Sequence, residues 1–218
     1  MGTGKELQTS ERFRVGALLA VTGGLLDSYT YLLRGGVFAN AQTGNIVLLG
    51  VRAIEGDWRS VLHYLLPILA FAAGVLAAEC IKAWLKEARM VHWRQVTVGV
   101  ELVLLLLVAL IPHTLDALAN ILVSFVCAVQ VESFRKVHGN PFATTMCTGN
   151  LRSGTERLYH FFRTGQREYL GQAARYGGVI LFFIVGAGAG AWCSSMLGVY
   201  TVAVACIPLI TVLLLMRR

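Results

Sequence analysis

Long apolar runs separated by short polar connections dominate the chain. Each run falls within the roughly 17–25 residues that a helix needs to cross the hydrocarbon core of a membrane. The pattern therefore predicts six transmembrane helices. The apolar runs lie at about 15–33, 61–85, 95–112, 115–134, 174–197 and 199–216.

Two shorter runs, 37–51 and 141–151, are interrupted by Asn, Gln, Thr and Gly, and each contains a Thr-Gly-Asn triplet. The Thr of each triplet follows an acidic residue, Asp27 or Glu132, by 16 residues, and a Ser comes directly after each acidic residue. The two copies are 105 residues apart, which is about half of the chain. A polar pattern that occurs twice in apolar surroundings indicates an internal repeat.

A second duplicated pattern consists of small residues. The run Phe-x-x-Gly-x-x-x-Ala that begins at Phe71 parallels the run Phe-x-x-Gly-x-x-x-Gly that begins at Phe183. Small residues at this spacing let two helices approach closely. The alternating glycines from Gly186 to Gly190 extend the small face, so we interpret both runs as helix-packing surfaces.

The distribution of Lys and Arg predicts the topology. Both residue types are frequent in 82–94, in 152–175 and at the C-terminus, whereas the turns near 112–116 and 195–199 contain neither. Because cytoplasmic loops carry an excess of Lys and Arg, the first three regions belong in the cytoplasm and the two turns outside. The count of crossings agrees with these sides only if the two short polar runs enter the membrane and return to the side they came from.

This assignment of loops to the two sides of the membrane predicts an all-α membrane protein with six transmembrane helices, arranged as two inverted three-span repeats. Each repeat contains one short re-entrant polar segment with its Thr-Gly-Asn triplet, and both termini lie in the cytoplasm. Arg34, Arg52 and Arg59 are exceptions, because this topology puts them on the outer side. The predicted parts are an N-terminal cytoplasmic tail at 1–11, a first membrane repeat at 12–112 and a second membrane repeat at 113–218.

Composition agrees with lipid as the solvent of this chain. Of its 218 residues, 56% are hydrophobic and 14% are charged, against about 25% charged residues in soluble domains. The net charge is +7, but the basic residues fall between apolar segments and do not cluster with aromatic residues on one surface. The expected partner is therefore the lipid bilayer, and nucleic acid is not expected.

Asp27 and Glu132 are the sharpest candidates for chemistry, because each lies within an apolar span at matching repeat positions. A carboxyl at the centre of a membrane helix costs roughly 2.5–3.5 kcal/mol on insertion scales, so it usually has a function or a compensating partner. One interpretation is a proton or cation relay beside the two re-entrant segments. The alternative is structural: each carboxyl caps the neighbouring broken backbone, or pairs with a base such as Arg135.

The polar residues of both repeats together form the predicted solute- or ion-binding set. Gly permits a break or a close approach of the backbone, while Thr and Asn can satisfy freed backbone groups at membrane depth. The candidate residues are Asp27, Asn40, Gln42, Thr43, Gly44, Asn45, Gln130, Glu132, Thr145, Thr148, Gly149 and Asn150.

The sequence from Gly35 to Gly50 is similar to the signature of the YoaK family, a group of bacterial integral membrane proteins classed under a domain of unknown function. Gly23–Asp27, Gln130–Ser133 and Thr144–Asn150 also resemble this family. Gln42 stands where other members would be expected to carry Thr or a similar residue. The resemblance covers nearly the whole chain and implies a six-span protein of the bacterial inner membrane, without supplying a substrate.

The leading functional hypothesis is a small secondary transporter or channel for a small polar solute or ion. Its site would lie at the membrane midplane between the inverted repeats, with proton coupling through Asp27 and Glu132. The alternative is a non-transporting scaffold or partner-binding protein, in which Gly-rich faces would drive homo-oligomerisation. An enzyme is not expected, because no nucleophile–base set is recognisable, and scattered histidines predict neither a metal site nor a cofactor.

Overall fold

The computed structural model describes residues 13–88, 93–134, 136–137, 140–141 and 147–216. These residues are helical apart from connecting turns and one antiparallel pair of two-residue strands, β1 (Lys136–Val137) and β2 (Asn140–Pro141). The prediction of an all-α chain is confirmed at this level. The helices are α1 (Phe13–Leu33), α2 (Gln42–Ile54), α3 (Trp58–Ala88), α4 (Trp93–Val108), η2 (His113–Leu115), α5 (Asp116–Ser133), α6 (Cys147–Thr164), α7 (Arg167–Leu197), η3 (Gly198–Tyr200), α8 (Thr201–Val204) and α9 (Cys206–Met216).

Within the described ranges, three helical stretches are long and apolar enough to cross a membrane: Trp58–Leu85, His113–Ser133 and Arg167–Met216. The third stretch is interrupted at Gly198, whose φ of +55° starts a turn between α7 and α8. The chain is therefore a helical membrane protein. The count of six spans stays a prediction.

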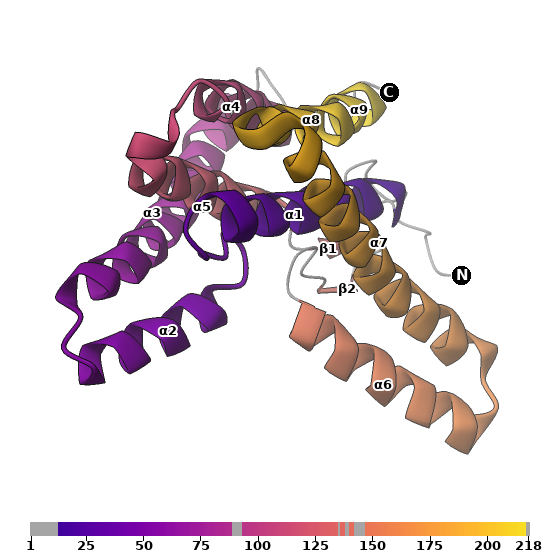
Figure 1. Ribbon diagram of the computed structural model, residues 1–218. Coiled ribbons are helices and arrows are strands. Elements are labelled where there is room, and N and C mark those ends of the chain that lie inside the picture. The colour runs from indigo at the N-terminus through magenta and orange to yellow at the C-terminus, as the bar shows by residue number, and fades with distance from the viewer. Residues whose placement is uncertain (1–12, 89–92, 135, 138–139, 142–146, 217–218) are drawn as a thin grey trace.

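The helices of the two halves pack crosswise. Helix α1 packs along α7, and α5 packs along α3, so each half supplies a long partner for the first helix of the other half. In the same way, α4 of the first half packs on α5 of the second half, and α9 of the second half packs on α1 of the first. In Figure 1 the α2–α3 and α6–α7 hairpins diverge downward from this central layer, one on each side.

The same kind of turn closes both hairpins. Gly56, between α2 and α3, has φ of +74°, and Gly165, between α6 and α7, has φ of +70°. Only glycine adopts this left-handed conformation at little cost. After Gly56, hydrogen bonds from Ser60 to the Asp57 carboxylate cap the start of α3 and lower the pKa of Asp57.

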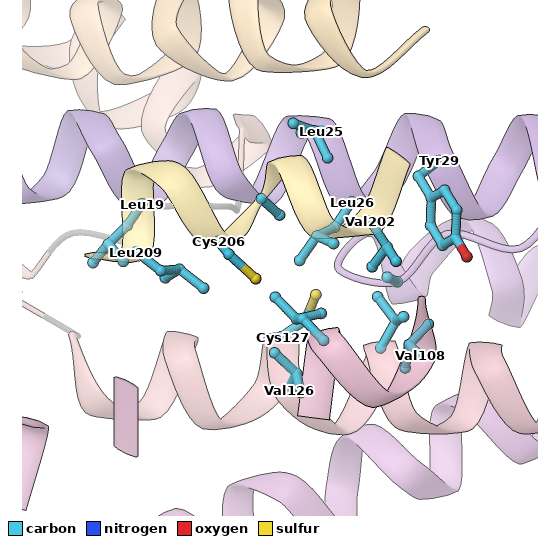
Figure 2. Packing of buried hydrophobic residues seen from close by; sticks show 14 of the residues in the cluster. Leu19, Leu25, Leu26, Tyr29, Val108, Val126, Cys127, Val202, Cys206 and Leu209 are labelled. Carbon is cyan, nitrogen blue, oxygen red and sulfur yellow. The ribbon is translucent and has the colours of Figure 1, made fainter. Parts of the chain in front are cut away.

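The main hydrophobic core lies between α1, α4, α5, α8 and α9. Figure 2 shows Leu19 and Leu26 of α1 facing side chains of α5 and α9 across one apolar layer. Val126 of α5 and Leu209 of α9 are fully buried in it. Burial of these side chains holds the first helix of each half against the last helix of the other.

Glycines permit the close crossings of α1 with α7 and of α3 with α5. A Cβ atom on Gly186 would overlap the backbone of Val21, and one on Gly74 would lie 2.5 Å from the carbonyl oxygen of Phe125. The two glycines occupy matching places in the duplicated Phe-x-x-Gly runs. In contrast, a Cβ on Gly188 would have no atom within 4 Å. The packing interpretation of these runs therefore agrees with the geometry.

Arg34 fastens the end of α1 to the connection between α4 and α5. Its side chain is fully buried, and it donates to the Tyr29 hydroxyl at 2.8 Å and to the Asp116 carboxylate at 2.7 Å. It also donates to the carbonyl oxygens of Ile111 and Pro112, at 2.8 and 3.2 Å. In the sequence, Arg34 is only an exception to the topology rule, because its partners across the fold are not recognisable there.

At the other end of the central layer, side chains tie further helix ends together. The Arg94 guanidinium donates to the carbonyl oxygen of Ser133, and the Gln95 amide donates to that of Met216, both at 3.0 Å. The Gln130 amide donates to the carbonyl oxygen of Leu19 at 3.1 Å. The start of α4 thus lies beside the ends of α5 and α9.

Candidate functional site

A cavity of about 840 Å³ lies where α1, α3, α6, α7 and the segment leading into α2 meet. Thr43 of the first triplet and Thr148 and Gly149 of the second triplet all line it. The structure therefore brings together two polar segments that are 105 residues apart in the sequence. The other lining residues are Asp27, Ser28, Tyr31, Leu32, Phe38, Asn40, Ala41, Gln42, Ile68, Phe71, Ala72, Cys147, Phe183 and Ala187.

Asp27 lies at the wall of the cavity and organises the segment before α2. Its side chain is only 5% exposed, and its Oδ1 accepts a hydrogen bond from the backbone N–H of Asn40 at 2.7 Å. The Asn40 amide in turn donates to the carbonyl oxygen of Gly23 at 3.2 Å. Gly35 and Gly36, with φ of +84° and +77°, turn the chain back toward α1. Asp27 thus caps a broken backbone, as the structural interpretation expects, while it still faces the cavity.

Asn45 holds the same segment from the other side. Its fully buried amide donates to the Phe38 carbonyl oxygen at 2.6 Å and to Gln42 Oε1 at 2.9 Å, and its Oδ1 accepts from the Phe38 N–H at 3.0 Å. A Cβ on Gly44 would lie 2.8 Å from the Phe38 ring. In the first triplet, Thr43 therefore faces the cavity, Gly44 leaves room for an aromatic ring, and Asn45 fixes the backbone.

The second triplet repeats part of this arrangement. Asn150, like Asn45, is almost fully buried, and Thr148 faces the cavity. Gly149 differs from Gly44, because a Cβ there would have no atom within 4 Å. Thr145 lies outside the described residues.

Among the described candidates, Gly44, Asn45, Gln130, Glu132 and Asn150 are not part of the lining, and Gln130 and Glu132 lie on α5, which contributes nothing to it. Glu132 is half-buried and is not part of the lining, although its counterpart Asp27 is. Gln130 is buried, and its amide donates a hydrogen bond to the carbonyl oxygen of Leu19. The structure therefore gathers at the cavity the predicted residues Asp27, Asn40, Gln42, Thr43, Thr148 and Gly149.

Aromatic side chains form much of the wall, and the site prediction did not include them. Tyr31 and Phe38 stack with ring centroids 4.8 Å apart. Phe71 and Phe183 line the cavity from α3 and α7. These two phenylalanines open the duplicated small-residue runs, so their matching positions were visible in the sequence, but there we interpreted those runs as packing surfaces alone.

Two helices begin at the cavity. Gln42 is the first residue of α2 and Cys147 the first of α6, and both line it. A helix N-terminus carries a partial positive charge and backbone N–H groups without helical partners. The residue before α2, Ala41, provides no side-chain cap. At the start of α2, the N–H groups of Gln42 and Gly44 donate to the carbonyl oxygens of Asn40 and Ala41. The first turns therefore contribute the partial positive charge of the helix dipoles to the cavity.

No group of three or more His, Cys, Asp and Glu side chains that could hold a metal ion occurs among the described residues. The groups that line the cavity offer hydrogen bonding through Thr43 and Thr148, apolar contact through the aromatic rings, and the carboxyl of Asp27.

The fold defines a helical membrane protein with a largely apolar cavity, to which both Thr-Gly-Asn segments contribute. The chain matches the family model described as "Protein of unknown function (DUF1275)" over residues 15–215, and it belongs to that family. It is 28% identical over 184 residues to UPF0700 transmembrane protein YoaK of Bacillus subtilis (strain 168), over 78% of this chain and 79% of the relative. The resemblance to the YoaK family is confirmed. No solved structure matches the chain.

Proposed function

We propose that this protein is a small transporter that binds one solute molecule in the cavity between two inverted three-span repeats. The observation that carries the proposal is the meeting of both triplets at one cavity, with Thr43 from one half and Thr148 from the other. Many transporters build their site at the interface of two repeats, from helices that are interrupted there.

The crosswise packing of the helices supports inverted repeats. Exchanging the two halves converts the α1–α7 contact into the α5–α3 contact, and the α2–α3 hairpin into the α6–α7 hairpin. The same exchange relates Gly74 to Gly186 and Gly56 to Gly165. A two-fold axis in the membrane plane exchanges two inverted halves in this way. In such an arrangement, α2 and α6 are the two re-entrant segments.

Side-chain hydrogen bonds between helix ends support the proposed topology. Arg34 joins the end of α1 to the α4–α5 connection, the end that the charge pattern assigns to the outside. Arg94 and Gln95 join the start of α4 to the ends of α5 and α9, which the charge pattern assigns to the cytoplasm. We therefore propose a multi-pass protein of the bacterial inner membrane with six spans and both termini in the cytoplasm.

The lining of the cavity narrows the class of solute. A volume of about 840 Å³ is in the range of pockets for organic molecules and exceeds the need of a single ion. Tyr31, Phe71 and Phe183 provide apolar contact. The hydroxyl groups of Thr43 and Thr148 provide donors. The proposed solute is a small organic molecule with an apolar body and a carboxylate or carbonyl group.

Asp27 is the proposed coupling residue, since it is the carboxyl of the repeat pair that faces the cavity. In reconstituted vesicles, we expect short-chain carboxylates to drive proton uptake, measured with an internal pH dye and on solid-supported membranes. Asp27→Asn should abolish the proton flux. Glu55→Gln, which changes an exposed carboxyl at the end of α2, should leave it unchanged. Equal proton flux in Asp27→Asn and the native protein would reject coupling through this residue.

Thiol labelling distinguishes the transporter from a scaffold. In a chain with its cysteines replaced by serine, Thr43→Cys and Thr148→Cys should react with a membrane-impermeant maleimide, and solute should protect both. Asn45→Cys and Asn150→Cys serve as buried controls. If neither cavity position reacts from either side, and no carboxylate moves protons, the scaffold is the better description.

A further inference from the structure

A second carboxyl lies in the core, away from the cavity and outside both repeated polar segments. Glu101 is on α4, on the same buried face as Val98, Leu105 and Val108, and it is fully buried. Neither of its carboxyl oxygens has a hydrogen-bond partner within the described part of the chain. It is unlike Asp27, whose Oδ1 accepts a backbone hydrogen bond.

The apolar surroundings of Glu101 do not stabilise a negative charge. An ionised carboxylate without a partner in such a core costs several kcal/mol or more, and the group binds a proton instead. Its neighbours belong to the main hydrophobic core, where α4 packs against α5 and α9. A carboxyl placed there is therefore neutral.

One apolar layer extends from Glu101 to the wall of the cavity. Cys127 of α5 is buried in the same cluster as Val98 and Leu105, which flank Glu101 on α4, and as Leu26 and Ala39, which adjoin Asp27 and Asn40 in the chain. Figure 2 shows Cys127 in the same apolar layer as Cys206 of α9. The two carboxyls therefore border one low-dielectric region, the apolar layer that contains Cys127.

Other charged groups near α4 lie toward the ends of the helices. At the start of α4, Arg94 is bonded to Ser133, and Lys82 of α3 lies 5.9 Å from the ring centroid of Trp93. Helix α8 carries no titratable residue. The titratable and charged groups on the helices that pack on α4 are Asp116, Cys127 and Glu132 on α5, Cys206 on α9, and Arg59, His63, Tyr64, Glu79, Cys80, Lys82, Lys86 and Glu87 on α3. Helix α4 itself carries Arg94, and α1 carries Arg14, Asp27, Tyr29 and Tyr31.

We propose that Glu101 is an intramembrane proton-binding site, occupied in this arrangement and coupled to Asp27 at the cavity through the core layer that contains Cys127. Two negative charges in one low-dielectric region repel each other, so the pair carries at most one. Release of the proton from Glu101 is then favoured only while Asp27 is protonated. This site does not depend on the identity of any transported solute.

Infrared spectroscopy of the reconstituted protein, with ¹³C in the glutamate carboxyl carbons, tests the proposal. We expect an isotope-shifted band of a protonated glutamate at neutral pH, absent in Glu101→Gln and present in the control Glu132→Gln. If the band is the same in native protein and Glu101→Gln, the proton site is refuted. Should Glu101→Gln fail to fold, Glu101→Asp retains the carboxyl and must remove the ¹³C-shifted band, because aspartate is unlabelled.

Coupling is tested separately with Asp27→Asn. Removal of the cavity carboxylate takes away a like charge, so the Glu101 band should disappear at a pH lower by about one unit, a tenfold change in proton affinity. The control Glu55→Gln should leave the titration unchanged. An identical titration in Asp27→Asn and native protein would overturn the coupling. Because none of these measurements involves a solute, failure of the transporter proposal would not change their outcome.

Discussion

Arg34→Ala is expected to lower the free energy of unfolding by about 3–5 kcal/mol, because breaking a buried ion pair leaves its remaining partners without compensation. The substitution strands the buried Tyr29 hydroxyl, the carbonyl oxygens of Ile111 and Pro112, and the Asp116 carboxylate. It also empties the volume of the largest fully buried side chain described. Thermal unfolding in detergent micelles, followed by circular dichroism, measures the effect.

Arg52→Ala is the matched control for this prediction. Arg52 forms an ion pair with Glu55 at the same 2.7 Å as the pair of Arg34 with Asp116, but both side chains are largely exposed. Exposed pairs contribute little to stability, so this variant should unfold close to the native temperature. Equal melting temperatures for the two variants would show that the Arg34 contacts do not hold α1 to the α4–α5 connection.

Arg34 also illustrates what sequence patterns could not predict. A basic residue at the end of an apolar run is normally a topology signal, and the partners of Arg34 other than Tyr29 are 77 to 82 residues away in the chain. Glu101 was missed for a related reason. It has no matching acidic residue in the second half, so the repeated polar pattern does not predict it.

The parts that could be predicted rest on duplication. The repeated Thr-Gly-Asn triplets predicted related segments in both halves, and the structure brings Thr43 and Thr148 to one cavity. The repeat could not predict that Asp27 would line this cavity while Glu132 would not, because each carboxyl position depends on the path of the connection that follows. In the first half, the backbone N–H of Asn40 in that connection donates a hydrogen bond to the Asp27 carboxylate. In the second half, α5 is followed by the β1–β2 pair.

The second polar segment also extends further than its apolar pattern indicated. The predicted segment ends near residue 151, whereas α6 continues as one helix to Thr164. Its later residues include Arg157 and Arg163, whose charges hide a helix from a search for apolar runs. Packing on α7 stabilises this helix. A Cβ on Gly154 would lie 3.1 Å from the Cβ of Tyr176, closer than an ordinary contact, so glycine at this position lets the two helices approach.

Gly186→Ala is expected to be the most damaging single-methyl change among the glycines of α7 that face α1. A Cβ at this position would overlap the backbone carbonyl of Val21, and backbone atoms cannot turn aside as the end of a flexible side chain can. Ordinary overpacking costs about 1–3 kcal/mol, and we expect a larger loss here because α1 and α7 must move apart. The melting temperature in micelles measures this loss.

Gly188→Ala, two residues along the same helix, is the matched control. It adds the same methyl group to an interior helical position, but no atom lies within 4 Å of it. Since alanine favours a helix over glycine by roughly 0.8–1.0 kcal/mol, this variant should be as stable as native protein or more stable.

Gly24→Ala, whose Cβ would overlap Phe183 across the same crossing, should reproduce the effect of Gly186→Ala. Combining Gly24→Ala with Gly186→Ala should cost less than the sum of the two, because either methyl group alone already separates the helices. Strict additivity would mean that the two glycines act on separate contacts, and that no single crossing joins the first helix of one half to the long helix of the other.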